Sequence, residues 1–196
     1  MKQGSKQIGK AFLGLALGLV WLIPFYLMVT NSFKTKQEIF TNPLKFPEAF
    51  TFENYPEAFR QLDFIRTLAN SLLITVSSVI IIVIFSAMAA YALERIKSKF
   101  STVTFMVFVA AMLVPFQSVM IPLVALFGKA QMLNQIGIIF MYLGFGGSMS
   151  IFLYHGAMKS IPRALDEAAI IDGASRWQVF WKVIFPMLKP TTVTVA

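Results

Sequence analysis

Residues that could catalyse a reaction are few and far apart in this sequence of 196 residues. It contains one histidine, His155, and no cysteine. Catalysis by a nucleophile needs a partner base, and no acidic residue adjoins His155 in the sequence. We expect its imidazole to bond a helix or lie at the membrane interface rather than relay protons. The carboxylates lack the spacing of metal ligands, so we predict no catalytic residue, cofactor or metal on this chain.

Phosphate binding is the next chemistry to consider, because residues 4–10 read GSKQIGK. These letters fit the first seven positions of a P-loop, in which the next position supplies the hydroxyl that holds Mg²⁺. Ala11 stands at that position, and no strand-like segment precedes the glycine. We interpret the stretch as a basic tail. If the protein depends on ATP and Mg, another chain must bind them.

Polar side chains inside an apolar stretch could instead contact a solute. Gln117 and Ser118 lie between Pro115 and Pro122, which are close enough in a helix to share a face. Prolines leave backbone carbonyls free, and a water-lined cavity can accommodate them. We therefore predict a kinked segment in which Gln117 and Ser118 contribute to a substrate path. A hydrogen bond from Gln117 to another helix is an equally good explanation.

A charged stretch between residues 160 and 186 contrasts with the apolar sequence around it. Pro162 suits the first turn of a helix, and Gly173 suits its end. Asp166 and Glu167 would interact favourably with the N-terminal end of the helix dipole. One face of this helix would combine small side chains with an acidic end: Leu165, Ala168, Ala169 and Asp172.

A second short helix should follow the first. Ser175 and Gln178 have the spacing of a capping box, which begins a helix. Tryptophan is favoured at the membrane interface, so we expect the aromatic face of this helix to lie there. That face consists of Trp177, Phe180, Trp181 and Ile184. The stretch is thus a helix-turn-helix that could transmit motion, or simply a solvated link.

These candidate residues must be positioned by helices, because the rest of the sequence is strongly apolar. Hydrophobic residues make up 57% of it, charged residues 13%, and the mean hydropathy is +0.71. Four uncharged windows each exceed the roughly 20 residues that a helix needs to cross a bilayer. The windows lack the alternation of barrel strands. We predict an all-α, polytopic transmembrane bundle with spans near residues 12–33, 69–93, 103–127 and 137–158.

The distribution of lysine and arginine predicts the topology. Basic residues collect before the first span, between the second and third spans, and after the fourth. Such loops stay in the cytoplasm, so we place the N-terminus and residues 160–186 inside. The net charge of +8 then reflects topology and gives no reason to expect a nucleic acid partner.

The charged stretch also carries a spaced motif. Its members are Glu167, Ala168, Ala169, Gly173, Val183, Phe185 and Pro186. This pattern resembles the EAA loop of ABC importer permeases, E-A-A-x₃-G-x₉-I-x-L-P, with valine and phenylalanine in place of the isoleucine and leucine. Flanking segments look like the carbohydrate-uptake branch of that family and are similar to the smaller permease of maltose-type systems. They are NSLLITVSS from Asn70, AAYALERIK from Ala89, MIP from Met120, and IPRALDEAAIIDGAS from Ile161.

The resemblance implies a permease subunit of a sugar importer in the plasma membrane of a prokaryote. It implies one MetI-like transmembrane domain over residues 1–196, with a fifth span beginning after residue 186 and further spans beyond the sequence. The implied partners are a second permease, two cytoplasmic ATPases, an extracytoplasmic solute-binding protein and membrane lipid. In such permeases the EAA loop docks on the ATPase. The resemblance therefore implies that the residues coupling this chain to the ATPase are Glu167, Ala168, Ala169, Asp172, Gly173 and Pro186.

Other functions remain open on the residues alone. An importer of another solute, such as a polyol or an amino acid, would carry the same loop. A channel or transporter that needs no ATP is disfavoured, because no expected span contains a charged residue and the polar loop would have no role. A membrane enzyme is disfavoured because it would need a catalytic constellation.

Overall fold

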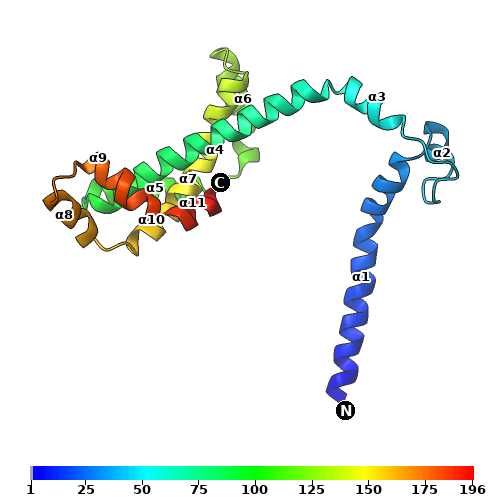
Figure 1. Ribbon diagram of the computed structural model, residues 1–196, viewed down its shortest axis with the longest axis horizontal. Helices are drawn as coiled ribbons and strands as arrows, with labels where there is room; N and C mark the ends of the chain where they lie inside the picture. Colours follow the sequence, from blue (N-terminus) through cyan, green and yellow to red (C-terminus); the bar gives the residue numbers. More distant parts are fainter. Residues whose placement is uncertain (1) are drawn as a thin grey trace. The chain divides into compact units, whose positions relative to one another are not determined.

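The computed structural model describes the backbone of residues 2–196 and the side chains of residues 10–196. In this part of the chain the regular elements are helices and none is a strand, which confirms the all-α prediction. The chain divides into two compact units, Met1–Leu68 and Ala69–Ala196, each taken by itself below (Figure 1). The side chains of Lys2 and Lys6, which support the predicted topology, lie outside the described residues.

The first unit is held together by a buried lysine. Its helices are α1 (Lys2–Ser32), α2 (Lys36–Thr41) and α3 (Asn54–Gln61). Lys34 is fully buried, and its Nζ donates to Asn31 Oδ1 at 2.8 Å. The same Nζ donates to the backbone carbonyls of Asn42 at 2.9 Å and Pro43 at 3.2 Å, at the C-terminal end of α2. Three donors thus meet three acceptors, as a buried ammonium group requires.

A second polar contact fixes the end of α1. The amide of Asn54 donates to the backbone carbonyls of Ser32 at 2.9 Å and Lys34 at 2.7 Å. The last carbonyls of a helix have no partner within it, so this side chain supplies one. Around this point the ring of Phe33 lies within 6 Å, centroid to centroid, of three other rings: Phe50, Phe52 and Tyr55.

The second unit contains most of α4 and all the later helices. These are α4 (Phe64–Arg95), α5 (Lys99–Ala111), α6 (Phe116–Lys129), α7 (Gln135–Lys159), α8 (Ala164–Ile171), α9 (Arg176–Val179), the π-helical turn η1 (Phe180–Ile184), α10 (Phe185–Met187) and α11 (Lys189–Val195). In Figure 1 the chain between α7 and α11 is drawn in gold to red and contains the short helices α8 and α9.

The segment expected to form the third span is divided between α5 and α6. The two helices meet at an angle of 100°. Pro115 lies at the break and has an extended backbone. A proline also disfavours helical geometry at the residue before it. The predicted kink therefore falls at Pro115, whereas Pro122 lies inside α6 without ending it.

Three helices of the described part are long and apolar enough to cross a membrane. They are Lys10–Ser32, Phe64–Arg95 and Gln135–Lys159, and the bent pair α5 and α6 makes four if it counts as one span. Many apolar side chains on these helices are exposed, as lipid or another membrane subunit would require.

The core of the second unit joins α4, α7 and the segment after α8. Its buried members are Ala87, Ala90, Tyr154, Met158, Ile161, Val179, Phe180, Ile184 and Leu188. Tyr154 is fully buried, and its hydroxyl donates to Thr192 Oγ1 at 3.0 Å, which links α7 to α11. The core therefore fixes the loop after α7 against two long helices.

Glycines in α7 permit close packing against α4. A Cβ added at Gly146 would lie 2.9 Å from the Ile82 side chain on α4. Next to it, the buried Ser86 hydroxyl lies 3.5 Å from the Gly147 carbonyl. The helix continues through these residues without unwinding.

Candidate functional site

The motif glutamate and alanines lie on α8, whose end is fixed by Gly173. The amide of Ala174 donates to the Ala169 carbonyl at 2.9 Å, and the Gly173 amide donates to the Ile170 carbonyl at 3.0 Å. This pair of bonds is a Schellman motif, which needs a left-handed residue at its centre. Gly173 supplies it with φ of 84°. The predicted helix stop is therefore confirmed.

The next helix begins with the predicted capping box. The Ser175 hydroxyl accepts from the Gln178 amide at 3.3 Å, and the Gln178 side chain accepts from the Ser175 amide at 2.8 Å. Only three residues separate α8 from this box, so the chain changes direction abruptly between the two helices. The two consecutive caps therefore fix the backbone conformation of the corner between α8 and α9.

The helix after this corner widens into a π-helical turn, which the sequence analysis missed. The amide of Phe185 bonds to the carbonyl of Phe180, five residues back. Pro186 follows at once; it has no amide hydrogen, and its ring would clash with the carbonyl four residues earlier. The wider turn removes this conflict, and turns of this kind often occur at functional sites.

The aromatic face of this segment is only partly exposed. Trp177 is 59% exposed, but Phe180 and Ile184 are buried in the core. The expectation that the whole face lies at the membrane interface was therefore wrong. The π-helical turn and the contact between Phe180 and Tyr91, with ring centroids 5.3 Å apart, direct this face against α4 instead.

Most motif side chains lie on the surface. Glu167, Ala168 and Asp172 are exposed, whereas Ala169 is half-buried against the core. Beside them a cavity of about 350 Å³ is lined in part by Ala169, Asp172 and Gly173. An exposed helix face with small side chains and two carboxylates is suited to contact another protein closely. Pro186 is also exposed, on the far side of the π-helical turn.

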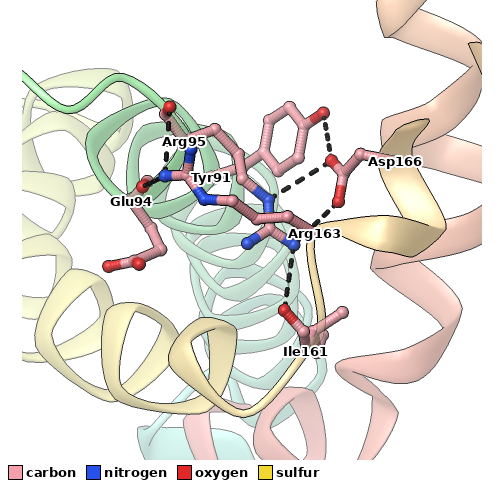
Figure 2. A network of polar contacts seen from close by, with 6 residues as sticks. All are labelled: Tyr91, Glu94, Arg95, Ile161, Arg163 and Asp166. Carbon is pink, nitrogen blue, oxygen red and sulfur yellow. Dashed lines mark hydrogen bonds and ion pairs between the residues drawn. The ribbon is translucent and has the colours of Figure 1, made fainter.

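A polar network joins α8 to the last turn of α4 (Figure 2). Asp166 is 7% exposed and accepts from the Tyr91 hydroxyl at 2.8 Å. Its second oxygen, Oδ2, lies 2.8 Å from Arg95 Nη2. From the sequence, Asp166 was expected only to interact with the helix dipole, and its contact with Arg95 was not predicted. The four-residue spacing of Tyr91 and Arg95, which places both on one helix face, was the available signal.

Arg163 contributes to the same network from the residue before α8. Its Nη2 donates to the backbone carbonyls of Glu94 at 2.6 Å and Arg95 at 3.2 Å. In return, Arg95 Nη2 donates to the backbone carbonyl of Ile161 at 3.3 Å. Arg163 thus satisfies carbonyls that α4 leaves free at its C-terminal end, and Arg95 satisfies a carbonyl in the link between α7 and α8.

His155 has a partner that its sequence neighbours did not indicate. Its Nε2 lies 3.2 Å from Glu94 Oε2, and its ring stacks on Phe105 with centroids 3.9 Å apart. The imidazole is 8% exposed. This contact joins α7 to the same last turn of α4. Of the two expected positions for the imidazole, bonded to a helix or at the membrane interface, the first therefore fits better.

The candidate substrate-path residues lie apart from the motif loop along the chain. Gln117 and Ser118 occupy the first turn of α6, and both are exposed. Two largely apolar cavities, of about 520 and 750 Å³, adjoin this region. Neither of these two cavities is lined by Gln117 or Ser118.

Metal binding has no structural support among the described residues. Within them, no group of three or more histidine or carboxylate side chains is placed to hold a metal ion.

Long apolar helices define a multi-pass membrane protein, and its short helices α8 and α9 form an exposed polar corner. Residues 82–196 match the family described as "Binding-protein-dependent transport system inner membrane component". The chain belongs to this family. It is a permease subunit of an ABC transport system, a membrane component without catalysis of its own, as predicted.

Individual relatives agree with the predicted carbohydrate-uptake branch. The chain is 55% identical to the "Probable starch degradation products transport system permease protein AmyC" of Thermoanaerobacterium thermosulfurigenes, over 94% of this chain and 68% of that protein. It is 37% identical to the "Multiple sugar-binding transport system permease protein MsmG" of Streptococcus mutans, over 90% of this chain and 65% of that one. The chain thus spans about two thirds of these relatives.

A solved structure has the same fold. It is described as "Crystal structure of a bacterial ABC transporter involved in the import of the acidic polysaccharide alginate". The match has a TM-score of 0.83 and 26% identity, and it covers 100% of this chain and 69% of the other. The prediction of an all-helical permease fold is confirmed.

Proposed function

We propose that this chain forms part of the path by which a sugar or oligosaccharide is imported, and that α8 couples this path to an ATPase. The observation that carries the coupling is the exposed face of α8, whose C-terminal end is fixed by a Schellman motif and by the capping box that begins α9. The sugar rests on the relatives, which include the starch-product, multiple-sugar and "Melibiose/raffinose/stachyose import permease protein MelC" permeases.

The coupling residues have distinct roles in this proposal. Glu167 and Ala168 on α8, and Asp172 directly after it, contact the ATPase, because their side chains are exposed. Ala169 packs α8 on its support, and its small side chain permits a close approach of the ATPase surface. Gly173 fixes the corner. The remaining member, Pro186, maintains the wide turn that leads into α11.

The proposed assembly contains a second permease, two cytoplasmic ATPases and an extracytoplasmic solute-binding protein. ATP and Mg²⁺ are held by the ATPases. The membrane is the plasma membrane of a prokaryote, with the N-terminus and α8 on the cytoplasmic side, since basic residues adjoin both. Residues 1–196 form one permease domain, of which α11 begins a further span.

Gln117 and Ser118 are proposed to line the solute path. Both side chains are exposed at the break between α5 and α6, where Pro115 interrupts the helix. Their amide and hydroxyl groups can exchange hydrogen bonds with sugar hydroxyls.

Glu167→Ala tests the coupling. The importer, assembled with its partner subunits in proteoliposomes, should lose about tenfold in uptake of labelled sugar per ATP hydrolysed, because an interaction of ~1.4 kcal/mol at the contact is removed. Glu48→Ala, at an exposed glutamate of the first unit, is the matched control and should leave the ratio unchanged.

Intact ATPase binding with normal uptake by Glu167→Ala would contradict the proposed contact. The solute is tested separately, by offering labelled maltodextrins, polyols and amino acids to the unaltered importer. Uptake of a polyol or an amino acid in place of sugars would contradict the sugar assignment and leave the coupling result standing.

A further inference from the structure

The last turn of α4 holds α8 through polar side chains, in addition to the packing of Ala169 against the core. Asp166 receives hydrogen bonds from the Tyr91 hydroxyl and from Arg95 Nε, at 2.8 and 3.3 Å. The side chains of Arg95 and Asp166 are only 13% and 11% exposed. Charge-assisted pairs of this kind, shielded from water, are stronger and more directional than surface pairs.

Apolar packing does not replace these contacts. A cavity of about 270 Å³ lies between the last turn of α4 and α8, lined by Tyr91, Arg95, Asp166 and Glu167 among others. With this space between the two helices, the attachment depends on the polar bonds that cross it. The bonds drawn in Figure 2 are therefore the mechanical link between α8 and α4.

Two arginines add further hydrogen bonds between α4 and the segment that contains α8. Arg163 donates to the carbonyls of Glu94 and Arg95, and Arg95 donates to the carbonyl of Ile161. A rotation of α8 about its axis would have to break the bonds of Asp166 as well as those of Arg163. A displacement of α8 is thus passed to α4 before these bonds are lost.

We propose that Arg95 and Asp166 are positioning residues that form a clamp, so that α4 moves together with α8 when the ATPase displaces it. This inference rests on the proposed coupling function of α8. Force from the ATPase then enters the membrane through α4 as well as through the covalent connections of α8 to α7 and α11. Neither residue needs to touch the ATPase or the solute.

Removing one partner of the pair should uncouple the importer. Arg95→Gln leaves a buried carboxylate without its cation, and Asp166→Asn leaves a buried guanidinium without its anion. We expect each to lower uptake per ATP hydrolysed by about tenfold while the subunits still assemble. The exchanged pair, Arg95→Asp with Asp166→Arg, restores the ion pair but not the hydrogen bonds to the Tyr91 hydroxyl and the Ile161 carbonyl, so it should recover only part of the lost ratio, which loss of a mere packing contact would not allow.

Two further variants bracket this result. Arg95→Lys keeps the charge but not the forked geometry, so it should be intermediate. Arg60→Gln breaks the exposed pair of Arg60 with Glu57, whose side chains are 79% and 40% exposed, and should leave the ratio unchanged. If Arg95→Gln assembles normally and keeps the full ratio, the clamp is refuted.

A measurement that involves no solute separates the clamp from the proposed function. The sequence has no cysteine, so Ala92→Cys and Ala164→Cys can carry two spin labels in the assembled importer. Electron paramagnetic resonance should give the same dipolar coupling without nucleotide and with trapped ATP, and a different coupling in the two states once Arg95→Gln is added.

The outcomes are distinguishable. A constant dipolar coupling without uptake of any tested sugar supports the clamp and contradicts the proposed solute. Normal sugar uptake with a dipolar coupling that changes between nucleotide states in the unaltered chain overturns the clamp and leaves the proposed function intact.

Discussion

Gly173 shows how one residue type can be required where there is ample space. A Cβ at this position would meet no atom within 4 Å, so crowding does not explain the glycine. Its φ of 84° does, because side-chain-bearing residues avoid that region by about 1–2 kcal/mol. The requirement therefore concerns the backbone conformation of the corner after α8.

Gly173→Ala should weaken the hydrogen bonds that close the corner after α8. Gly173→Asn should weaken them less, because asparagine tolerates the left-handed region better than alanine. We expect the amide of Ala174, which bonds to Ala169, to exchange hydrogen about tenfold faster in Gly173→Ala, in line with a cost of ~1–2 kcal/mol. Hydrogen exchange followed by mass spectrometry measures this. Equal protection in Gly173→Ala and the unaltered protein would show that the left-handed backbone costs nothing here.

Single residues were predictable from the sequence where their role is local. Gly173, Ser175 and Pro115 act on the backbone within a few residues of themselves, and their effects are those expected. The partners of Asp166 and His155 were not predictable. Asp166 is 71 residues from Arg95 in the sequence, and only the fold brings them together.

At the scale of elements, the two short helices depend on their caps more than on their length. An isolated helix of this size is unstable in water, since about 12–15 residues are needed. The four residues of α9 are held by the capping box and by the burial of Val179. The sequence predicted the box but not the π-helical turn, because no local pattern besides Pro186 signals the extra residue.

Ser175→Ala removes the side-chain acceptor of the box and should destabilise the start of α9 by about 1 kcal/mol. Ser175→Thr retains a hydroxyl and is the control. The amide of Gln178, which now bonds to Ser175, should lose protection against hydrogen exchange in the alanine variant and keep it in the threonine variant. Equal loss in both variants would mean that crowding at this position, rather than the cap, sets the protection.

Across the described part of the chain, three of the four apolar windows correspond to single helices long enough to cross a bilayer, which imposes a minimum length. The windows do not predict how the helices pack. They also do not predict that the third window is divided into α5 and α6, which meet at an angle of 100°. The core around Tyr154 and Leu188 was also not predictable, since it joins segments far apart in the sequence.

Ala90→Leu should disrupt this core. Ala90 is fully buried between α4 and the segment after α8, and an added side chain there costs about 1–3 kcal/mol. Ala92→Leu, two residues away on the exposed side of the same helix, should change stability by no more than about 0.5 kcal/mol. Thermal unfolding of the purified protein in detergent compares them, and equal midpoints would exclude close packing at Ala90.

The π-helical turn from Phe180 to Ile184 also affects the number of residues between Gly173 and Pro186 in the spaced motif. A π-helical bond spans one more residue than an α-helical bond, so the chain between Gly173 and Pro186 holds one residue beyond what a regular helix would use. Deleting that residue would rotate everything after it by roughly 100°, the angle of one helical residue, and would turn Leu188 away from the core. The fixed number of residues between the glycine and the proline thus determines how α11 is rotated about its axis relative to α8.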